Sequence, residues 1–499
     1  MLEAFWGGLV NIFTWPAFPL MIVGIIVGFW VGILPGLGGA VTLALMIPFI
    51  YGMEPIAAFA FLLGMHSVVQ TTGDITSILF GVPGEGTAAA TIVDGHPMAK
   101  KGEAGRALGA ALFSSLIGAL IGAFALAASI PVIQPLVLAL GSPELFMLTL
   151  LGISFIASLS GGSVIRGLAS GFFGFLLATV GMSDQTATLR YTFGQVYLFD
   201  GLSLVPITIG LFAIPEIIDL AVRGTSIAET HFGKLVGVWE GVKDTVRHWG
   251  LTVRASLIGT FIGLIPGMGG SVAQWVAYGH AVQSSKDKSR FGQGAVEGVL
   301  GPGAANNSKE GGSLIPTVAF GVPGSLSTAI LLGAFLIVDL EPGPEMLSKH
   351  LDVTFSMVWI IVVANIITVA ASFVFLDHLA KITLVRGSLI IPFLLLLIFL
   401  GSFATNNDFG DIVVMLLFGL LGYLMVLFRW PRPPLILGLV LGGLSERYLF
   451  ISVQRYKAEW LTFPGVIVIL LLMLAALTYP LVQARYARRR AARGMVREN

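Results

Sequence analysis

The sequence predicts an all-α polytopic membrane protein built on two inverted-topology repeats with broken or re-entrant helices. Three observations lead to this fold class. The chain of 499 residues is 56% hydrophobic and only 11% charged, whereas a soluble domain carries about 25% charged residues. Apolar windows near the roughly 20 residues that a spanning helix needs recur along the chain. Two short tags rich in Pro and Gly occur twice, in the same order.

The apolar windows predict about 10–12 membrane segments. Clear windows run over 107–130, 144–160, 164–182, 201–222, 354–376, 387–405, 410–428 and 463–482. More ambiguous segments lie near 18–34, 55–70, 251–265 and 312–340. None of these runs shows the ten-residue alternation of a membrane β-barrel.

Composition and missing motifs argue against several functional classes. The chain has no cysteine, which excludes disulfides, thiolate nucleophiles and cysteine-bound metals. Its net charge of +1 argues against a nucleic-acid partner. The sequence contains neither His-Glu-x-x-His nor Gly-x-Ser-x-Gly. We therefore expect neither an enzyme nor a resident cofactor.

Charge placement predicts the orientation, because Lys and Arg collect in cytoplasmic loops. The C-terminal segment ARYARRRAARGMVREN is expected to be cytoplasmic. Lys100, in the basic KKGEAGR segment, is also expected inside, whereas Glu341, in the acidic EPGPEML segment, is expected outside.

The duplicated tags predict the repeats. GILPGLGG at 32–39 returns as GLIPGMGG at 263–270, and GVPG occurs at 81–84 and at 321–324. The first copy ends in a basic segment and the second in an acidic one, so the copies are expected to have opposite membrane sense, as in many secondary transporters. The first repeat (core about 20–98) lies in an N-terminal half, 1–250, and the second (core about 251–340) in a C-terminal half, 251–499.

The first tag of each copy predicts a helix break at membrane depth. Proline removes a backbone donor and blocks a continuing helix, and glycine permits positive φ and close backbone approach. In lipid such a break survives only against protein or a wet cavity. Packing alone can explain a single membrane glycine, but duplication in order favours a functional role. The expected break residues are Pro35, Gly36, Gly38, Gly39, Pro266, Gly267, Gly269 and Gly270.

The second tag of each copy predicts a solute site. A helix that starts inside the membrane presents free N–H groups and hydroxyls, which suit an anion without any formal charge. Asparagine amides upstream of the second copy suit either a solute or an ion. The expected substrate-binding residues are Gly84, Thr87, Asn306, Asn307, Gly324, Ser325, Ser327 and Thr328.

Ionisable side chains within the apolar segments predict a cation site, because such groups are costly there and are usually functional. Asp74, together with Thr71 and Thr72, is expected to bind the coupling ion, Na⁺ or H⁺. The adjacent Lys309 and Glu310 are expected to form an ion pair, with a solute carboxylate as the alternative partner of Lys309.

The stretch GILPGLGG...IPFIYGMEPIAAFAFLLGMH, followed by ILFGVPGEGTAAATIVDGHPMAKKGEAGRALGAAL, resembles the TctA family, the large membrane subunit of the tripartite tricarboxylate transporters. The similarity is densest over 29–112 and 260–345, and DGHPMAKKG is quite specific to the family. The resemblance implies carboxylate uptake across the bacterial inner membrane, coupled to Na⁺ or H⁺. It also implies a small TctB-like membrane subunit and a periplasmic TctC-like solute-binding protein.

Two other functions remain open from the sequence. A gated channel would need a continuous polar pore, and its flux would not require a cation gradient. A non-transporting structural membrane subunit would have no need of duplicated breaks at membrane depth. We therefore expect a secondary transporter whose solute, ion and oligomeric state the sequence leaves undetermined.

Overall fold

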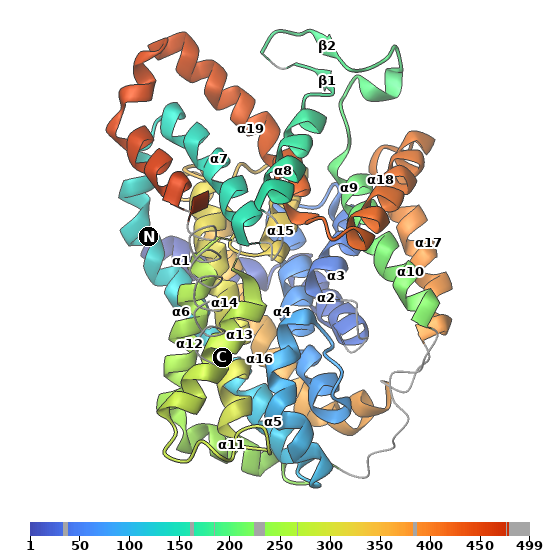
Figure 1. Ribbon diagram of the computed structural model, residues 1–499, viewed down its shortest axis with the longest axis vertical. Helices are drawn as coiled ribbons and strands as arrows, with labels where there is room; N and C mark the ends of the chain where they lie inside the picture. The colour runs from blue at the N-terminus through green and yellow to red at the C-terminus, as the bar shows by residue number, and fades with distance from the viewer. Residues whose placement is uncertain are drawn as a thin grey trace, which may run out of the picture. The chain divides into compact units, whose positions relative to one another are not determined.

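The structure is a computed structural model, and it confirms the all-α polytopic fold class (Figure 1). It describes residues 1–32, 38–159, 164–183, 185–223, 235–266, 268–382, 387–475 and 477–478. Strand structure in this part of the chain is limited to the two-residue strands β1 (Gly181–Met182) and β2 (Leu189–Arg190), which pair antiparallel.

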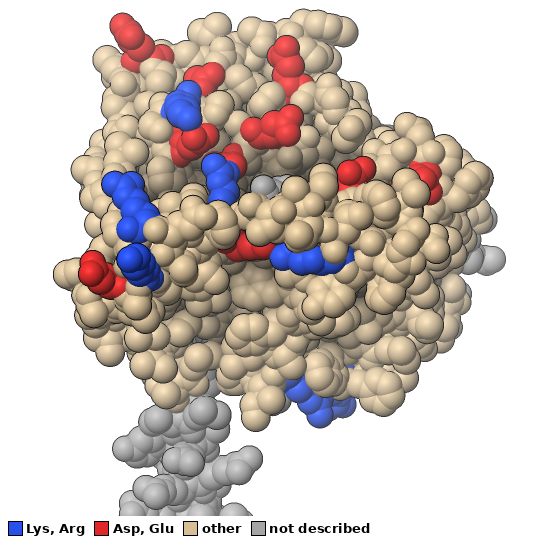
Figure 2. All heavy atoms as spheres, turned by 90° about the horizontal axis from the view of Figure 1, so that it is seen from above, with Lys and Arg blue, Asp and Glu red and all other residues tan. Residues whose placement is uncertain are grey.

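Five helices of the described residues are long and apolar enough to cross a membrane, or six if the bent pair α1 and α2 forms one span. Seven further apolar helical stretches of 10–17 residues occur in the described part of the chain, and two of them belong to longer helices, α7 (Ser142–Leu159, 18 residues) and α17 (Gly387–Asn406, 20 residues). The described residues thus contain five or six helices of spanning length, fewer than the 10–12 membrane segments predicted from the sequence. Large apolar side chains are exposed on many helices, and charged side chains are few on the face seen in Figure 2.

The chain forms two compact units, and they cut across the predicted halves 1–250 and 251–499. The first unit comprises 1–138 and 203–424, and it contains both predicted repeat cores; the second comprises 139–202 and 425–499. The helical elements of the first unit are α1 (Leu2–Ile12), α2 (Ala17–Gly32), α3 (Gly39–Met46), η1 (Ile47–Ile50), α4 (Pro55–Phe80), η2 (Gly86–Ala88), α5 (Ala89–Lys100), α6 (Ala104–Leu138), α9 (Leu204–Thr208), η4 (Ile209–Ala213), α10 (Ile214–Arg223), α11 (Val238–Arg247), α12 (Trp249–Leu264), α13 (Gly269–Ser284), α14 (Glu297–Phe320), α15 (Leu326–Ile337), α16 (Leu351–Ile382), α17 (Gly387–Asn406) and most of α18 (Phe409–Leu427).

The second unit packs α7 (Ser142–Leu159) and α8 (Val164–Ala178) against α19 (Pro433–Tyr456). The strand pair is tied to α19 by a two-pronged ion pair, in which the Arg190 guanidinium lies 2.8 and 3.0 Å from the two carboxylate oxygens of Glu446. The unit also contains η3 (Val196–Leu198), η5 (Glu459–Thr462) and an apolar helix over Pro464–Ala475.

Helices α4 and α14 form the centre of the first unit. Every residue from 57 to 79 in α4 and from 297 to 319 in α14 is buried. A helix that is buried on all sides faces protein rather than lipid. The polar residues that the sequence places in these two helices are therefore held inside the protein.

The two central helices run antiparallel. Asn306 of α14 contacts Gln70 of α4, and Glu310 contacts His66, so the residue number rises in one helix as it falls in the other. Both helices end the same way, at a glycine with a left-handed φ of 67° (Gly81) or 66° (Gly321), which is a common helix terminator. An inverted repeat would need such an antiparallel pair, and the repeat itself stays a prediction.

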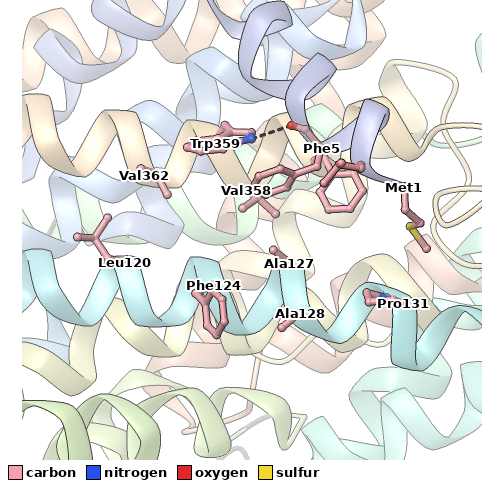
Figure 3. Close-up of a pocket in the computed structure, with 12 residues that line it drawn as sticks. Met1, Phe5, Leu120, Phe124, Ala127, Ala128, Pro131, Val358, Trp359 and Val362 are labelled. Atoms are coloured by element: carbon pink, nitrogen blue, oxygen red, sulfur yellow. Dashed lines mark hydrogen bonds between the residues drawn. The ribbon is translucent and has the colours of Figure 1, made fainter.

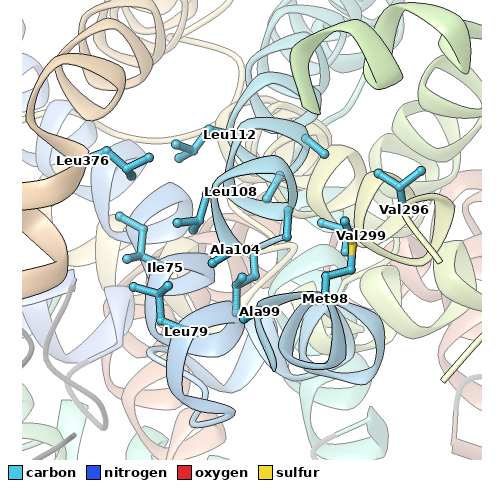
Figure 4. Packing of buried hydrophobic residues seen from close by; sticks show 14 of the residues in the cluster. Ile75, Leu79, Met98, Ala99, Ala104, Leu108, Leu112, Val296, Val299 and Leu376 are labelled. Carbon is cyan, nitrogen blue, oxygen red and sulfur yellow. The ribbon is translucent and has the colours of Figure 1, made fainter. Parts of the chain in front are cut away.

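Apolar packing joins α4 and α14 to their neighbours (Figure 4). One buried cluster brings together Ile75 and Leu79 of α4, Met98 of α5, Leu108 of α6 and Val299 of α14. Where α6 crosses α14, Gly122 faces Gly311, and a Cβ on Gly311 would lie 2.1 Å from the Gly122 carbonyl oxygen. Only residues without a side chain allow the two backbones to approach this closely.

The loop before α14 is clamped to α5 of the first copy. It contains the SSKDKSRFGQG stretch in which the tag spacing predicts about nine extra residues. One carboxylate oxygen of the buried Asp94 accepts hydrogen bonds from the amides of Gly292, Gly294 and Ala295 at 2.8–2.9 Å. Its other oxygen accepts one from the Tyr278 hydroxyl at 3.0 Å. The DGHPMAKKG segment therefore anchors the second copy.

Candidate functional site

The first tag of the first copy brings the start of α3 against α4. Helix α2 ends at Gly32 and α3 begins at Gly39, with Gly38 before it; Pro35 and Gly36 lie outside the described residues. A Cβ on Gly39 would lie 2.6 Å from His66 Nδ1 and 3.0 Å from Gln70 Nε2. The glycine therefore lets the amino end of α3 contact two polar side chains of α4.

The corresponding tag of the second copy brings the start of α13 against both copies. Helix α12 ends at Leu264, Pro266 follows in a turn, and α13 begins at Gly269 with φ of 67°; Gly267 lies outside the described residues. A Cβ on Gly270 would lie 2.5 Å from Lys309 Cε and 2.6 Å from Thr87 Cγ2. The amino end of α13 thus meets a cation of its own copy and a hydroxyl-bearing residue of the other.

Buried ionic contacts connect α4 and α14 between these two helix starts. Lys309 Nζ donates a hydrogen bond to Glu310 Oε1, which is the predicted ion pair. Glu310 Oε2 lies 3.1 Å from His66 Nε2, a contact without hydrogen-bond geometry. This cluster is neutral when His66 is neutral, and it carries one positive charge when His66 is protonated.

Glu85 and Thr87, which follow α4 in the chain, form hydrogen bonds to Gln70 and connect this buried cluster to less buried residues. Gln70 Nε2 donates to Glu85 Oε1 at 3.0 Å, and Thr87 Oγ1 donates to Gln70 Oε1 at 3.4 Å. Glu85 and Thr87 are half-buried, whereas Gln70 is buried. The Glu85 side chain also packs beside Gly38, so a protein carboxylate already lies at the amino end of α3. At the amino end of α13, by contrast, the neighbouring side chains are those of Lys309 and Thr87, and neither is a carboxylate.

The two predicted asparagines cross-link three helices. Asn306 Nδ2 donates to the Gln70 carbonyl oxygen at 2.9 Å. Asn307 Nδ2 donates to Thr71 Oγ1 and to Asn365 Oδ1 of α16, both at 2.8 Å. Neither Oδ1 atom has a hydrogen-bond partner among the described residues. Buried polar atoms are normally satisfied, so both amide oxygens are available to a ligand.

Asp74 is buried beside the network, 1% exposed, and neither carboxylate oxygen has a well-formed hydrogen bond in the described part of the chain. Thr91 and Glu85 lie within interaction range of it. Thr71 is three residues away and shares its side of α4, since residues three apart are helix neighbours. Thr72 points elsewhere: its hydroxyl donates to the Val68 carbonyl oxygen and lies against Gly32 of α2.

The second tags fold alike in the two copies. Gly84 packs against Gly73, and Gly324 packs against Ser313, each eleven residues back along the preceding helix. After Gly324, Ser325 caps α15: its hydroxyl accepts from the Thr328 amide, while Thr328 Oγ1 accepts from the Ser325 amide.

The hydroxyls of Ser325 and Thr328 are therefore used locally. The hydrogen bonds of Ser325 and Thr328 within the described residues join them to each other, and Ser327 is buried. None of these bonds joins them to Thr87. Thr87, Asn306 and Asn307 lie around the crossing of α4 and α14. Ser325 and Thr328, whose reciprocal hydrogen bonds form a capping box, lie at the start of α15.

Gln274 is a site residue that was not predicted from the sequence. It lies one turn after Gly270 in α13 and hence on the same helix face, the face that meets Lys309 and Thr87. It is 0% exposed, and neither its amide oxygen nor its amide nitrogen has a partner among the described residues. Its position in the sequence, four residues after the GLIPGMGG tag that predicts a helix break, could have indicated a role.

A separate cavity of about 400 Å³ does not suit a carboxylate. It lies between α1, α6 and α16, and Figure 3 shows the side chains of Phe5, Phe124, Val358 and Trp359 around it. Its lining side chains are apolar, and the Trp359 indole N–H already donates to the Phe5 carbonyl oxygen at 2.8 Å.

Comparison with known proteins agrees with the geometry. The profile of the tripartite tricarboxylate transporter TctA family matches residues 18–437, which include both pairs of tags and every residue of the polar network. The chain belongs to the TctA family. It is thus a multi-pass membrane component of a tripartite tricarboxylate transporter, and the family implies TctB-like and TctC-like partners.

Two relatives of this TctA-family chain come from Agrobacterium vitis. An uncharacterized 52.8 kDa protein in the TAR-I ttuC' 3'region is 31% identical over 427 residues, covering 86% of this chain and 85% of the relative. An uncharacterized protein in the TAR-II ttuC' 3'region is 29% identical over 191 residues, covering 38% of this chain and 79% of the relative. No solved structure matches the chain.

Proposed function

We propose that this TctA-family protein is a secondary transporter that takes up a carboxylate across the inner membrane. The solute, a tricarboxylate or another organic acid, is delivered by a periplasmic TctC-like binding protein, and a Na⁺ or H⁺ gradient drives uptake. The C-terminus is cytoplasmic. The two tag-bearing segments act as inverted repeats around the crossing of α4 and α14.

One observation carries this proposal: the amino end of α13 meets Thr87 and Lys309 beside a buried crossing of two helices. A helix start attracts an anion through its free N–H groups and its dipole. A solute carboxylate there gains the Thr87 hydroxyl, the Gln274 amide and the partly neutralised Lys309. Because Lys309 is already paired with Glu310, the solute is attracted without being held too tightly to leave.

Ion coupling follows from Asp74. A buried carboxylate without a fixed counter-charge is costly in its ionised form. Binding of H⁺ or Na⁺ removes this cost, and the free amide oxygens of Asn306 and Asn307 on the adjoining helix are ligands of the type that a hard cation prefers. Loading Asp74 also removes a negative charge near the solute site, which favours an incoming carboxylate.

The test is carboxylate uptake by Thr87→Ala and Ser327→Ala in proteoliposomes, with membrane abundance measured in parallel. A hydrogen bond to a charged group contributes roughly 1.5–3 kcal/mol, so loss of the Thr87 hydroxyl is expected to weaken apparent affinity by about tenfold to a hundredfold. Ser327→Ala removes the corresponding hydroxyl of the second copy and shows whether the start of α15 also holds solute. Normal apparent affinity in Thr87→Ala at normal abundance would contradict this placement of the site, whatever the result for Ser327→Ala.

A further inference from the structure

A second cavity, of about 500 Å³, lies at the opposite end of α12 and α13 from the solute site. Its lining includes Arg247 at the end of α11, His248 and Trp249 at the start of α12, Arg254 one turn further, and Lys286 and Arg290 beyond the end of α13. Helix α13 has 16 residues, so the cavity lies roughly 20 Å from the amino end of α13.

The charge of this cavity is positive. Four cationic side chains line it, against the two carboxylates of Asp287 and Glu297. Both carboxylates are used by Arg290, whose guanidinium lies 2.6 Å from Glu297 and 3.8 Å from Asp287. Arg247 pairs with Glu240 and Asp244 on its own helix. The net positive charge therefore rests on Arg254 and Lys286.

Those two cations are available to an anion. Arg254 Nε donates to His280 Nε2 at 3.1 Å, which orients the guanidinium across the α12–α13 pair without neutralising it. Neither Arg254 nor Lys286 has a carboxylate partner in the part of the chain that the structure describes. A guanidinium held by its Nε offers its terminal N–H groups to a phosphate.

An apolar surface continues from the cavity along α12. Leu257 is 55% exposed and Phe261 63% exposed, and both lie on the same helix face as Arg254, three and seven residues further. Trp249, at the start of the helix, is 68% exposed. Tryptophan is enriched where a membrane protein meets the lipid headgroups. A cationic cavity thus lies at the headgroup level, above a face that suits acyl chains.

We propose that this cavity binds the phosphate headgroup of an anionic phospholipid. The phosphate lies between Arg254 and Lys286, the Trp249 ring lies at the glycerol level, and the acyl chains follow Leu257 and Phe261. A free phosphate group would fit the same cations, but it would make no use of the exposed apolar stripe. The lipid site is independent of the solute site and does not rest on the proposed transport function.

The test compares binding of two lipids to the full-length purified protein in mixed micelles of a neutral detergent. The probes are dioleoyl phosphatidylglycerol and dioleoyl phosphatidylcholine, and bound lipid is counted by native mass spectrometry. Arg254→Gln with Lys286→Gln removes both available cations. Lys243→Gln with Lys288→Gln is the matched control, because it removes the same charge from α11 and from the same loop without touching the cavity lining.

Wild type and control are expected to prefer phosphatidylglycerol, and the Arg254/Lys286 variant is expected to bind it about thirtyfold more weakly, at about one kcal/mol per basic residue near an anionic surface. Lys286→Gln alone, an exposed loop substitution, is expected to weaken binding about fivefold even if the double variant does not fold. Equal binding of the two lipids, or an equal loss in the control, would overturn the proposal. Inorganic phosphate that binds as tightly as phosphatidylglycerol would identify a free phosphate group as the ligand, and would overturn it as well.

Discussion

The hydrogen bonds from three loop amides to Asp94 join the two copies, and their contribution can be tested by substitution. Asp94→Ala removes the acceptor of three loop amides. Gly292 is an exposed residue, Gly294 is half-buried and Ala295 is buried; the bonds from Gly292 and Gly294 are partly buried, and the bond from Ala295 is buried. Water replaces the lost bond at Gly292, so that bond contributes little. We expect about 1.5 kcal/mol from the charged bond to Gly294 and about 1.5 kcal/mol from leaving the Ala295 amide unpaired.

The free energy of opening the loop is therefore expected to fall by about 3 kcal/mol, which is roughly a hundredfold rise in the open population. When opening and closing are fast, cleavage by a protease follows that population. The assay is limited trypsin digestion of the purified protein, with cleavage after Lys288 and Arg290 quantified by mass spectrometry. Both residues lie in the loop that Asp94 holds.

Two further variants are expected to raise cleavage of the loop by less than Asp94→Ala does. Asp94→Asn keeps one acceptor oxygen for the amides and loses only the charge, so its rise in cleavage is expected to be about tenfold. Tyr278→Phe removes the bond to the other carboxylate oxygen and leaves the three amide bonds in place, so cleavage of the loop is expected to change little. Wild-type cleavage in Asp94→Ala, in a protein that is still folded and monodisperse, would refute the clamp.

Three further predictions concern coupling, packing and orientation. Asp74→Asn is expected to reduce the cation dependence of carboxylate uptake, because a neutral amide needs no counter-ion; uptake with unchanged ion dependence would make Asp74 structural. Gly324→Ala is expected to destabilise the fold by about 1–3 kcal/mol, because its Cβ would lie 2.4 Å from the Gly263 carbonyl oxygen. Gly279→Ala in α13, with nothing within 4 Å of its Cβ, is the control and is expected to be neutral or stabilising by up to about 1 kcal/mol; equal thermal unfolding midpoints for the two variants would contradict the packing. Single cysteines at positions 100 and 341 of this cysteine-free chain are expected to react with an impermeant reagent from opposite membrane faces, and labelling of both from one face would remove the inverted-repeat interpretation.

Hydropathy and the glycine–proline tags were sufficient to predict the all-α membrane fold class and the interruption between α12 and α13. Both depend on local properties of the chain. A long apolar run favours a lipid environment, and a proline removes a backbone donor while a glycine tolerates a left-handed turn. The pair alone does not end a helix, since Pro302 and Gly303 lie inside α14. The stretch between α12 and α13, from Leu264 to Gly269, lies where the GLIPGMGG tag predicted a break. The Lys309–Glu310 ion pair was predictable in the same way, because the two residues are neighbours in sequence.

Only the tertiary structure decided which of the polar residues meet. Gly39 reaches His66, Gly270 reaches Thr87, and Asn306 reaches Gln70. The last two contacts join residues from different copies of the repeat, and no local periodicity encodes a partner that far along the chain. The division into units at 138, 203 and 424 likewise depends on which helices pack, not on where the tags recur.

The roles of individual hydroxyls also depended on the fold. Thr87 and Ser325 both follow a Gly-Val-Pro-Gly tag closely, as the third and the first residue after it, and the sequence predicted the same role for both. In the structure Ser325 is bonded to Thr328 at the start of α15, whereas Thr87 reaches Gln70 on α4. Gln274 was not predicted from the sequence, yet it is buried, and its amide has no partner among the described residues, on the face of α13 that meets Lys309. Composition and spacing determine which groups enter the membrane, but the antiparallel packing of α4 against α14 determines which of them face one another.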